Sequence, residues 1–435
     1  MRTSAAGLAL VVVLWDTSGA VSVHILAQRD AGSPHSSPSS AAISADGRYV
    51  AFASYARLAP ADTNSHRDVY VLDRSDGEVT LESAAVSGLA ADADNGHPRI
   101  SADGRFLAYE AAGPSAHAPS WSEIVLRDRR DGSATIVSAG SGGARANAMS
   151  RHPAISQDGL VVVFSSSATN LVEGADANGG GEDVYLFDAR DRSLRRISVD
   201  SASQQPAGGQ SVTPAASGDG RYVVFASTAD LDRSGAAAGV RGRARVFVRD
   251  RLSDRTTPVS APPGGRMPDG ASWAPAISAD GRYIAFVSAA TNLTAGDRNR
   301  SADVFLADLH TGSVDLVSRR AGHAVPANGS SANPAVSADG RFVAFQSEAS
   351  DMICARCTST TEDVNLLWDV FLFDRRSRIM ARVSGDAAGE WMAPSVGPAV
   401  DGGGGLVVFS SRHPIDVSDT ANDWDLFLCD APSGS

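Results

Sequence analysis

The chain alternates short apolar runs with polar turns, and one such unit returns seven times. In the copy from Pro275 to Phe286, apolar and polar positions alternate on both sides of an Asp-Gly pair. A period of two residues is typical of a half-buried β-strand, and Asp-Gly favours the positive φ angles of a hairpin turn. The other copies begin at residues 41, 98, 153, 214, 334 and 398. A long period repeated this often indicates an array or a propeller.

Each copy predicts four antiparallel strands. In the fifth copy these are residues 275–278, 282–288, 304–307 and 314–318, with a second tight turn at His310-Thr-Gly312. The strands are short, rich in β-branched and aromatic residues, and bounded by Gly, Asp and Pro. Long runs with a helical period are absent from the sequence. Four short strands per repeat are the pattern of a β-propeller blade.

The number of strands predicts how the ring is closed. Copies of the third strand number seven, but copies of the fourth strand number six, because the chain ends soon after the last third strand. An additional strand, residues 21–28, precedes the first copy, and Leu26 to Gly32 aligns with Leu316 to Gly322. We therefore expect one all-β domain over residues 21–435, a seven-bladed β-propeller of four-stranded blades in which the N-terminal strand completes the last blade.

The motif Pro-x-Ile-Ser-x-Asp-Gly-Arg-Tyr-x-Ala-Phe, followed by Asp-Val-Tyr-Val-x-Asp, resembles the TolB-like, WD-like propeller repeats of bacterial exported proteins. The resemblance extends over residues 21 to 430. It implies the fold, because propellers carry many unrelated functions. TolB itself has an α/β domain before a six-bladed propeller, and this chain has no room for that domain. The last copy departs from the motif, since Gly403 replaces the turn Asp.

The N-terminus and the charge narrow the class of protein. Arg2, the apolar stretch Leu8 to Trp15 and the small residues Ser18-Gly-Ala20 predict a signal peptide over residues 1–20, so we expect a periplasmic or extracellular protein. A misplaced start codon is the alternative interpretation. No apolar run is long enough for a spanning helix, so an integral membrane protein is not expected. The net charge of −12 argues against nucleic acid as a partner.

Strand order places the long, variable loops and the blade-to-blade connections at one end of every blade, which we call the long-loop face. The short Asp-Gly and Thr-Gly turns lie at the opposite end. Variable loops on a rigid scaffold are the usual place for binding, so we expect the function at the long-loop face.

Three of these loops carry an Asp-x-Asn pattern followed by another Asp. Oxygen ligands in a short loop suit calcium, so calcium is a candidate cofactor. The side chains supply only about three ligands per loop, and Asx turns, in which Asp and Asn bond the nearby backbone, explain the same pattern. We favour Asx turns and keep calcium as the alternative. The residues concerned are Asp62, Asn64 and Asp68; Asp176, Asn178 and Asp183; and Asp297, Asn299 and Asp303.

Two further candidates are a histidine pair and a cysteine pair. His97 and His152 occupy the same place in neighbouring copies, where inner strands line the central channel. They could approach each other and hold a transition metal, although polar channel lining explains them too. Cys354 and Cys357 replace the Asp-x-Asn pattern in the sixth copy, and we expect a local disulfide there. Cys429 is expected on a blade strand.

Two repeated or aromatic sets have structural explanations beside functional ones. A serine precedes the turn in six copies, and six equivalent positions indicate a packing or turn role instead of a nucleophile. Four tryptophans near the variable segments could stack on sugars or anchor peptides, or pack between blades. These are Trp121, Trp273, Trp391 and Trp424.

No catalytic constellation stands out in the sequence. The expected function is therefore non-catalytic, with a protein, peptide or glycan bound at the long-loop face. The alternative is a metal-dependent polysaccharide lyase or hydrolase with its site at the channel mouth.

Overall fold

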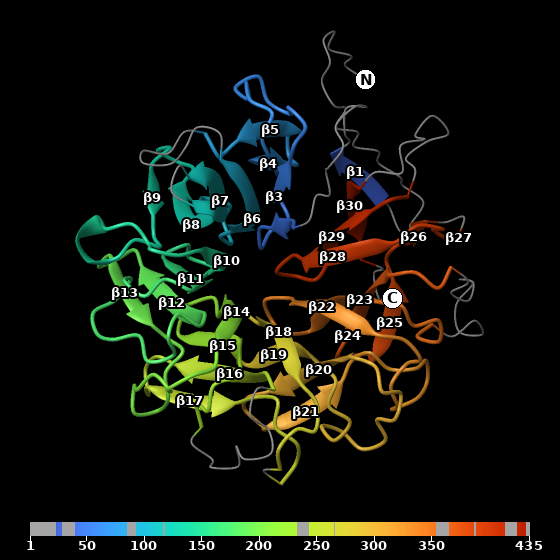
Figure 1. Cartoon of the computed structure of the whole chain (residues 1–435). Helices are drawn as coiled ribbons and strands as arrows, with labels where there is room; N and C mark the ends of the chain where they lie inside the picture. Colours follow the sequence, from blue (N-terminus) through green and yellow to red (C-terminus); the bar gives the residue numbers. More distant parts are fainter. Residues whose placement is uncertain are drawn as a thin grey trace.

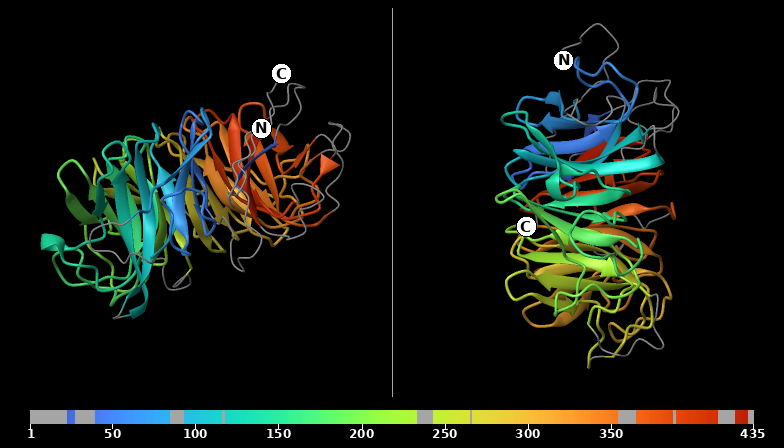
Figure 2. Two further views of the ribbon diagram at one scale, coloured as in Figure 1. Left: turned by 90° about the horizontal axis from the view of Figure 1, so that it is seen from above. Right: turned by 60° about the vertical axis from the view of Figure 1, so that its left-hand side comes forward.

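The computed structural model describes residues 23–27, 40–84, 93–115, 118–232, 243–264, 266–353, 365–386, 389–413 and 424–431. The chain forms an all-β, seven-bladed propeller. Figure 1 shows the sheets following one another around a circle in chain order, with the first blade in blue beside the last in red. In side view the sheets stand next to one another, with loops at both ends (Figure 2).

The strands of each blade run antiparallel in chain order from the inner strand outward. Blades one to three are β2 (Ala42–Ile43), β3 (Tyr49–Ser54), β4 (Asp68–Asp73) and β5 (Glu78–Leu81); β6 (Asp94–Ile100), β7 (Phe106–Ser115), β8 (Ala118–Asp128) and β9 (Ala134–Ile136); and β10 (Ser150–Ile155), β11 (Val161–Ser166), β12 (Asp183–Asp188) and β13 (Ser193–Arg196).

Blades four to six are β14 (Ser211–Ala216), β15 (Tyr222–Ser227), β16 (Arg245–Asp250) and β17 (Arg255–Pro258); β18 (Ser272–Ile277), β19 (Tyr283–Ser288), β20 (Asp303–Asp308) and β21 (Ser313–Leu316); and β22 (Ser331–Val336), β23 (Phe342–Ser347), β24 (Asp369–Asp374) and β25 (Ile379–Arg382). The seventh contains β28 (Ser395–Val400), β29 (Leu406–Ser411) and β30 (Asp425–Asp430). A two-stranded hairpin, β26 (Gly385–Asp386) and β27 (Gly389–Glu390), precedes it, and a 3-10 turn, Ser141–Gly143, precedes the third blade.

The hydrophobic core lies between neighbouring sheets. Apolar side chains of the two middle strands are almost completely buried, as in Val50, Phe52 and Leu72 of the first blade. In six blades an aromatic pair faces across these strands, as Phe286 and Phe305 do at a ring-centroid distance of 5.8 Å. Such pairs bury large areas and fix the register, because a slip of one residue would turn both rings to the other face of the sheet.

The repeated serine has a turn role, as predicted. In the fourth blade Ser217 Oγ donates to Asp219 Oδ1 at 2.6 Å and accepts the Tyr222 N–H at 2.9 Å. The same carboxylate accepts the Arg221 N–H, so one serine and one aspartate fix the Asp-Gly hairpin. In the seventh blade Asp401 replaces this serine and accepts the Leu406 N–H itself at 3.0 Å.

A ring of backbone hydrogen bonds joins all seven hairpins at the short-turn end. The N–H of each turn donates to the carbonyl of the next, and the last bond runs from Gly402 N–H to Ala45 O at 3.0 Å. This bond links the seventh blade directly to the first. The turn residues in order are Ala45, Ala102, Gln157, Gly218, Ala279, Ala338 and Gly402.

The N-terminal strand β1 (Val23–Ala27) runs antiparallel beside β30, with Val23 opposite Cys429 and Ile25 opposite Phe427. That this strand closes the ring stays a prediction, which a truncation can test. The predicted signal peptide, residues 1–20, lies outside the described residues. In the described part of the chain, no helix is long and apolar enough to cross a membrane.

Candidate functional site

The channel mouth at the long-loop face is shaped by a bulge in the inner strand. In blades two to seven the register of this strand shifts by one residue at the X-Pro or equivalent step. The bulged residue has a positive φ, between 48° and 66°, and this left-handed conformation re-aims its side chain. The bulged residues are His97, His152, Thr213, Ala274, Asn333 and Gly397.

The structure brings His97 and His152 together at this mouth. Their ring centroids are 6.5 Å apart. Glu110 on β7 lies between the two bulges: its Oε2 is 3.1 Å from His97 Nδ1, and its Oε1 accepts the His152 N–H at 2.6 Å. His152 Nδ1 in turn lies 3.2 Å from Ser165 Oγ. In both rings Nε2 is therefore the nitrogen left to face a ligand.

The charge of Glu110 is held in place by its neighbours. Burial alone raises the pKa of this carboxyl, but His97 and the His152 N–H outweigh burial, so the pKa lies below its ordinary value. Burial lowers the pKa of His152, against the opposing effect of Glu110 and Glu182. Glu110 is buried, and His97, with 39% of its side chain exposed, forms the accessible edge of the histidine pair.

The sixth blade shows what the fold itself needs at this position. Gln346 takes the place of Glu110, and its Oε1 accepts both the Asn333 Nδ2–H and the Gly397 N–H, each at 2.9 Å. A neutral amide therefore caps the bulge of the next blade as well as a carboxylate does. The negative charge of Glu110 is not required for the fold.

Sequence reasoning missed Glu110 and the basic residues around it. A departure from the repeat could have revealed them, because the position of Glu110 holds Ala, Ser or Val in most other copies. Arg99 stands where the equivalent inner strands carry Ala, and its pKa is lowered by burial and raised by Glu110. Arg151, next to His152, donates to Glu182. Two blades thus place two histidines, two arginines and two glutamates near one side of the mouth.

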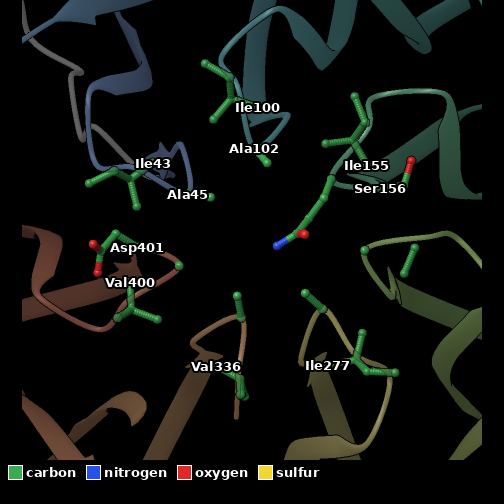
Figure 3. A pocket seen from close by; sticks show the side chains of 16 residues that line it. Ile43, Ala45, Ile100, Ala102, Ile155, Ser156, Ile277, Val336, Val400 and Asp401 are labelled. Carbon is green, nitrogen blue, oxygen red and sulfur yellow. The ribbon is translucent and has the colours of Figure 1, made fainter. Parts of the chain in front are cut away.

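The other end of the channel has a different character. There, apolar side chains line a cavity of about 170 Å³, which Figure 3 shows with the side chains arranged around a central opening. The turn residues of the hydrogen-bonded ring form its rim. The channel is therefore apolar at the short-turn end and polar at the long-loop end. The apolar residues are Ile43, Ile100, Ile155, Ala216, Ile277, Val336 and Val400.

The Asp-x-Asn loops of the first and fifth blades contain the hydrogen bonds of Asx turns. In the first blade Asp62 Oδ1 accepts the Asn64 N–H at 3.1 Å, and Asn64 Nδ2 donates to Asp68 at 3.0 Å. In the fifth blade Asn299 Oδ1 accepts the Ser301 N–H at 3.0 Å, and Asn299 Nδ2 donates to Asp303 at 2.9 Å. Across the described residues, no group of three or more His, Cys, Asp or Glu side chains is placed to hold a metal ion. Calcium binding by these loops stays a prediction.

Only one of the three cysteines lies in the described part of the chain. Cys354 and Cys357 lie outside the described residues, so their disulfide stays a prediction. Cys429 is a free, buried thiol on β30, as expected, and burial raises its pKa.

The tryptophans have different surroundings. Trp391 is buried and stacks on His413 at 4.2 Å, so it packs in the core. Trp273 is partly exposed on β18, and the Arg412 guanidinium lies 4.9 Å from the Trp424 ring centroid. The side chain of Trp121 lies outside the described residues.

Comparison with known proteins shows the fold and no family. No family model matches the sequence, and neither does any curated protein. An oligogalacturonate lyase from Vibrio parahaemolyticus is 12% identical with a TM-score of 0.53, over 91% of this chain and 90% of the lyase. The β-propeller domain of the Trilobed protease from Pyrococcus furiosus is 12% identical with a TM-score of 0.53, over 90% of this chain and 92% of the domain.

TolB from Acinetobacter baumannii is 17% identical with a TM-score of 0.39, over 72% of this chain and 58% of TolB. The similarity to TolB-like propellers is thus distant. At these identities the similarity defines the class, a β-propeller, and leaves the function open.

Proposed function

We propose that this chain is a non-catalytic propeller acting outside the cytoplasm, which binds a protein, peptide or glycan through its long-loop face. The observation that carries the proposal is the charged cluster at the channel mouth of blades two and three, formed by His97, Arg99, Glu110, Arg151 and His152. These residues break the repeat, and the sixth blade builds the same bulge without them.

The contrast with the rest of the repeat supports this proposal. The positions that the seven copies share serve the hairpin turns, the ion pairs between strands and the core. Partly exposed donors and acceptors that serve none of these purposes are a feature of recognition sites. Polar ligands such as glycans and peptide backbones would use them as hydrogen-bond partners, while the long loops around the mouth would supply area.

A binding screen with matched variants tests the proposal. Protein lacking residues 1–20 is applied to arrays of glycans and peptides, and each hit is measured by calorimetry. His97→Ala is expected to weaken binding at least tenfold, whereas Asn333→Ala, at the same bulge in the sixth blade, leaves it unchanged. Ala274 has a φ of 48° at this position, so alanine fits the bulge. Equal losses in both variants, or none, would contradict a site at blades two and three.

A metal-dependent lyase is the second candidate, and one observation favours it. Both Nδ1 atoms face protein partners, a carboxylate for His97 and a hydroxyl for His152. This is the arrangement in which Nε2 of an imidazole is oriented toward a metal. A bound metal would act as a Lewis acid there. Glu110 is already engaged by His97 and His152, so the residues fit such a centre poorly, and we rank this function second.

The two functions separate in one experiment. Purified protein is analysed for transition metals and incubated with a panel of acidic polysaccharides. If the protein contains a bound metal and shows turnover that His97→Ala abolishes, the catalytic function is supported and the non-catalytic proposal is wrong. Turnover that survives in this variant would place any activity elsewhere.

A further inference from the structure

The three Asp-x-Asn loops share a sequence pattern but differ in what faces their carboxylates. In the first blade the Tyr70 hydroxyl donates to Asp62 Oδ2 at 2.5 Å. The neighbouring carboxylate, Asp68, accepts from Ser83 Oγ and Asn64 Nδ2. Both carboxylates of this loop therefore have hydrogen-bond donors from the protein.

The third blade supplies a positive charge. Arg196 Nε lies 3.3 Å from Asp183 Oδ2, and its Nη2 lies 3.7 Å from Asp176 Oδ1. Gln205 Nε2 also donates to both carboxylates, at 2.7 Å each. The guanidinium thus acts as a cation built into this loop.

The fifth blade has neither of these groups. Phe305 replaces the tyrosine, and Leu316, the cross-strand partner of Phe305, stands where Arg196 pairs with Tyr185 in the third blade. Asp297 is more than nine-tenths buried, and its Oδ1 has no hydrogen-bond partner. Asp303 is completely buried, with Ser318 Oγ at 2.7 Å and Asn299 Nδ2 at 2.9 Å as neutral donors.

Two buried carboxylates need a proton or a cation to offset their charge. In the third blade Arg196 supplies the positive charge. In the fifth blade Asp297 Oδ1 is left without a partner, and Asp303 is bonded only by neutral groups, so a cation can supply the missing charge.

We propose that the fifth-blade loop binds one calcium ion through Asp297 and Asp303, at the place that corresponds to the Arg196 guanidinium in the third blade. Both side-chain ligands are carboxylate oxygens, which suit a hard cation that takes its further ligands from main-chain carbonyls and water. The carboxylates of the first and third loops already have hydrogen-bond donors or a guanidinium from the protein, so one ion per chain is expected. The site is separate from the charged cluster at the channel mouth.

Calorimetric titration of calcium chloride into chelator-treated protein tests the proposal. We expect one ion per chain and a rise in Tm of roughly 2–4 °C at millimolar calcium. Asp297→Asn, which keeps the side-chain shape, should abolish binding, and Asp62→Asn should leave it intact. Absence of binding at millimolar calcium, or binding that persists in Asp297→Asn, would overturn the proposal.

Two exchanges between blades make the test reciprocal. Phe305→Tyr brings in the hydroxyl of the first blade and should weaken calcium binding about tenfold. Arg196→Leu removes the cation of the third blade and should raise the stoichiometry from one ion to two. Circular dichroism establishes that each variant is folded. Unchanged affinity in a folded Phe305→Tyr, or unchanged stoichiometry in a folded Arg196→Leu, would contradict the proposed compensation.

Discussion

At the scale of single residues, small changes at one repeated position alter its chemistry. Most blades have an Asp at the third-strand position equivalent to Asp183, whose carboxylate accepts from Ser198 Oγ at 2.7 Å. The second blade has Glu123, which is completely buried with no hydrogen bond to either carboxylate oxygen. The equivalent serine, Ser138, accepts the Ile124 N–H at 2.9 Å and makes no hydrogen bond with Glu123. The Arg145 Nε atom lies 3.6 Å from Glu123 Oε1.

This carboxyl should make stability depend on pH. Burial raises the pKa of Glu123 to about 7, against a partial opposing effect of Arg145. The folded state therefore binds the proton more tightly than the unfolded state, and stability falls as pH rises from about 4.5 to 7. Glu123→Gln should remove this component and be more stable than the parent by ~1–3 kcal/mol at pH 8, with little difference at pH 4.5. Urea denaturation across this pH range measures the difference.

The buried serine of the hairpin should have a measurable cost when removed. Ser217→Ala leaves the Tyr222 N–H without its acceptor, so we expect a loss of ~1–3 kcal/mol in the free energy of unfolding. Ser75→Ala, at an exposed turn hydroxyl bonded to Asp73, is the control and should change stability by less than about 0.5 kcal/mol. Equal effects of the two changes in denaturant titrations would show that burial of the serine is unimportant.

At the scale of elements, the sequence predicted the strand order but missed the bulge. The inner strand of the fifth blade was expected from residue 275, and it begins at Ser272, because pairing continues across the bulge at Ala274. A residue before proline favours an extended conformation, so nothing in the residue types indicated a left-handed one. The ion pairs between strands were missed too: Arg221 binds Asp250 in bidentate fashion, at 2.9 and 2.8 Å.

The bulge stores strain that substitution should release. Thr213 is β-branched, has a φ of 49°, and its buried Oγ1 lacks a hydrogen-bond partner. Thr213→Gly should therefore raise the free energy of unfolding by ~1 kcal/mol. Ala274→Gly, at the same position in the fifth blade, removes less strain and should have a smaller effect. A destabilised Thr213→Gly in thermal unfolding would show that the hydroxyl contributes a contact that outweighs the strain.

At the scale of the whole molecule, the first and last blades are joined in more than one way. The Gly402–Ala45 hydrogen bond completes the ring of turns, and apolar side chains of β3 and β4 pack against Val408, Leu426 and Leu428 of the last blade. None of these contacts involves the N-terminal strand. That β1 completes the last sheet as its fourth strand stays a prediction.

Truncation should separate these contributions. Removal of residues 1–30 is expected to lower Tm by roughly 5 °C or more relative to removal of residues 1–20, because the edge of β30 loses its partner. The remaining contacts between blades one and seven should still allow folding. Identical melting curves for the two proteins would refute closure by the N-terminal strand.

The sequence by itself determined the class of fold, the number of blades and the face that carries variable loops. These follow from period-two patterning and turn residues, which are local and repeat with every blade. The tertiary structure decided which side chains meet. Glu110 of the second blade reaches the backbone of His152 in the third blade. Arg196 lies beside the carboxylates of the third-blade loop, whereas Phe305 and Leu316 occupy the equivalent places in the fifth blade and bring no charge. Such contacts depend on the bulge and on the packing of neighbouring sheets, which no local pattern encodes.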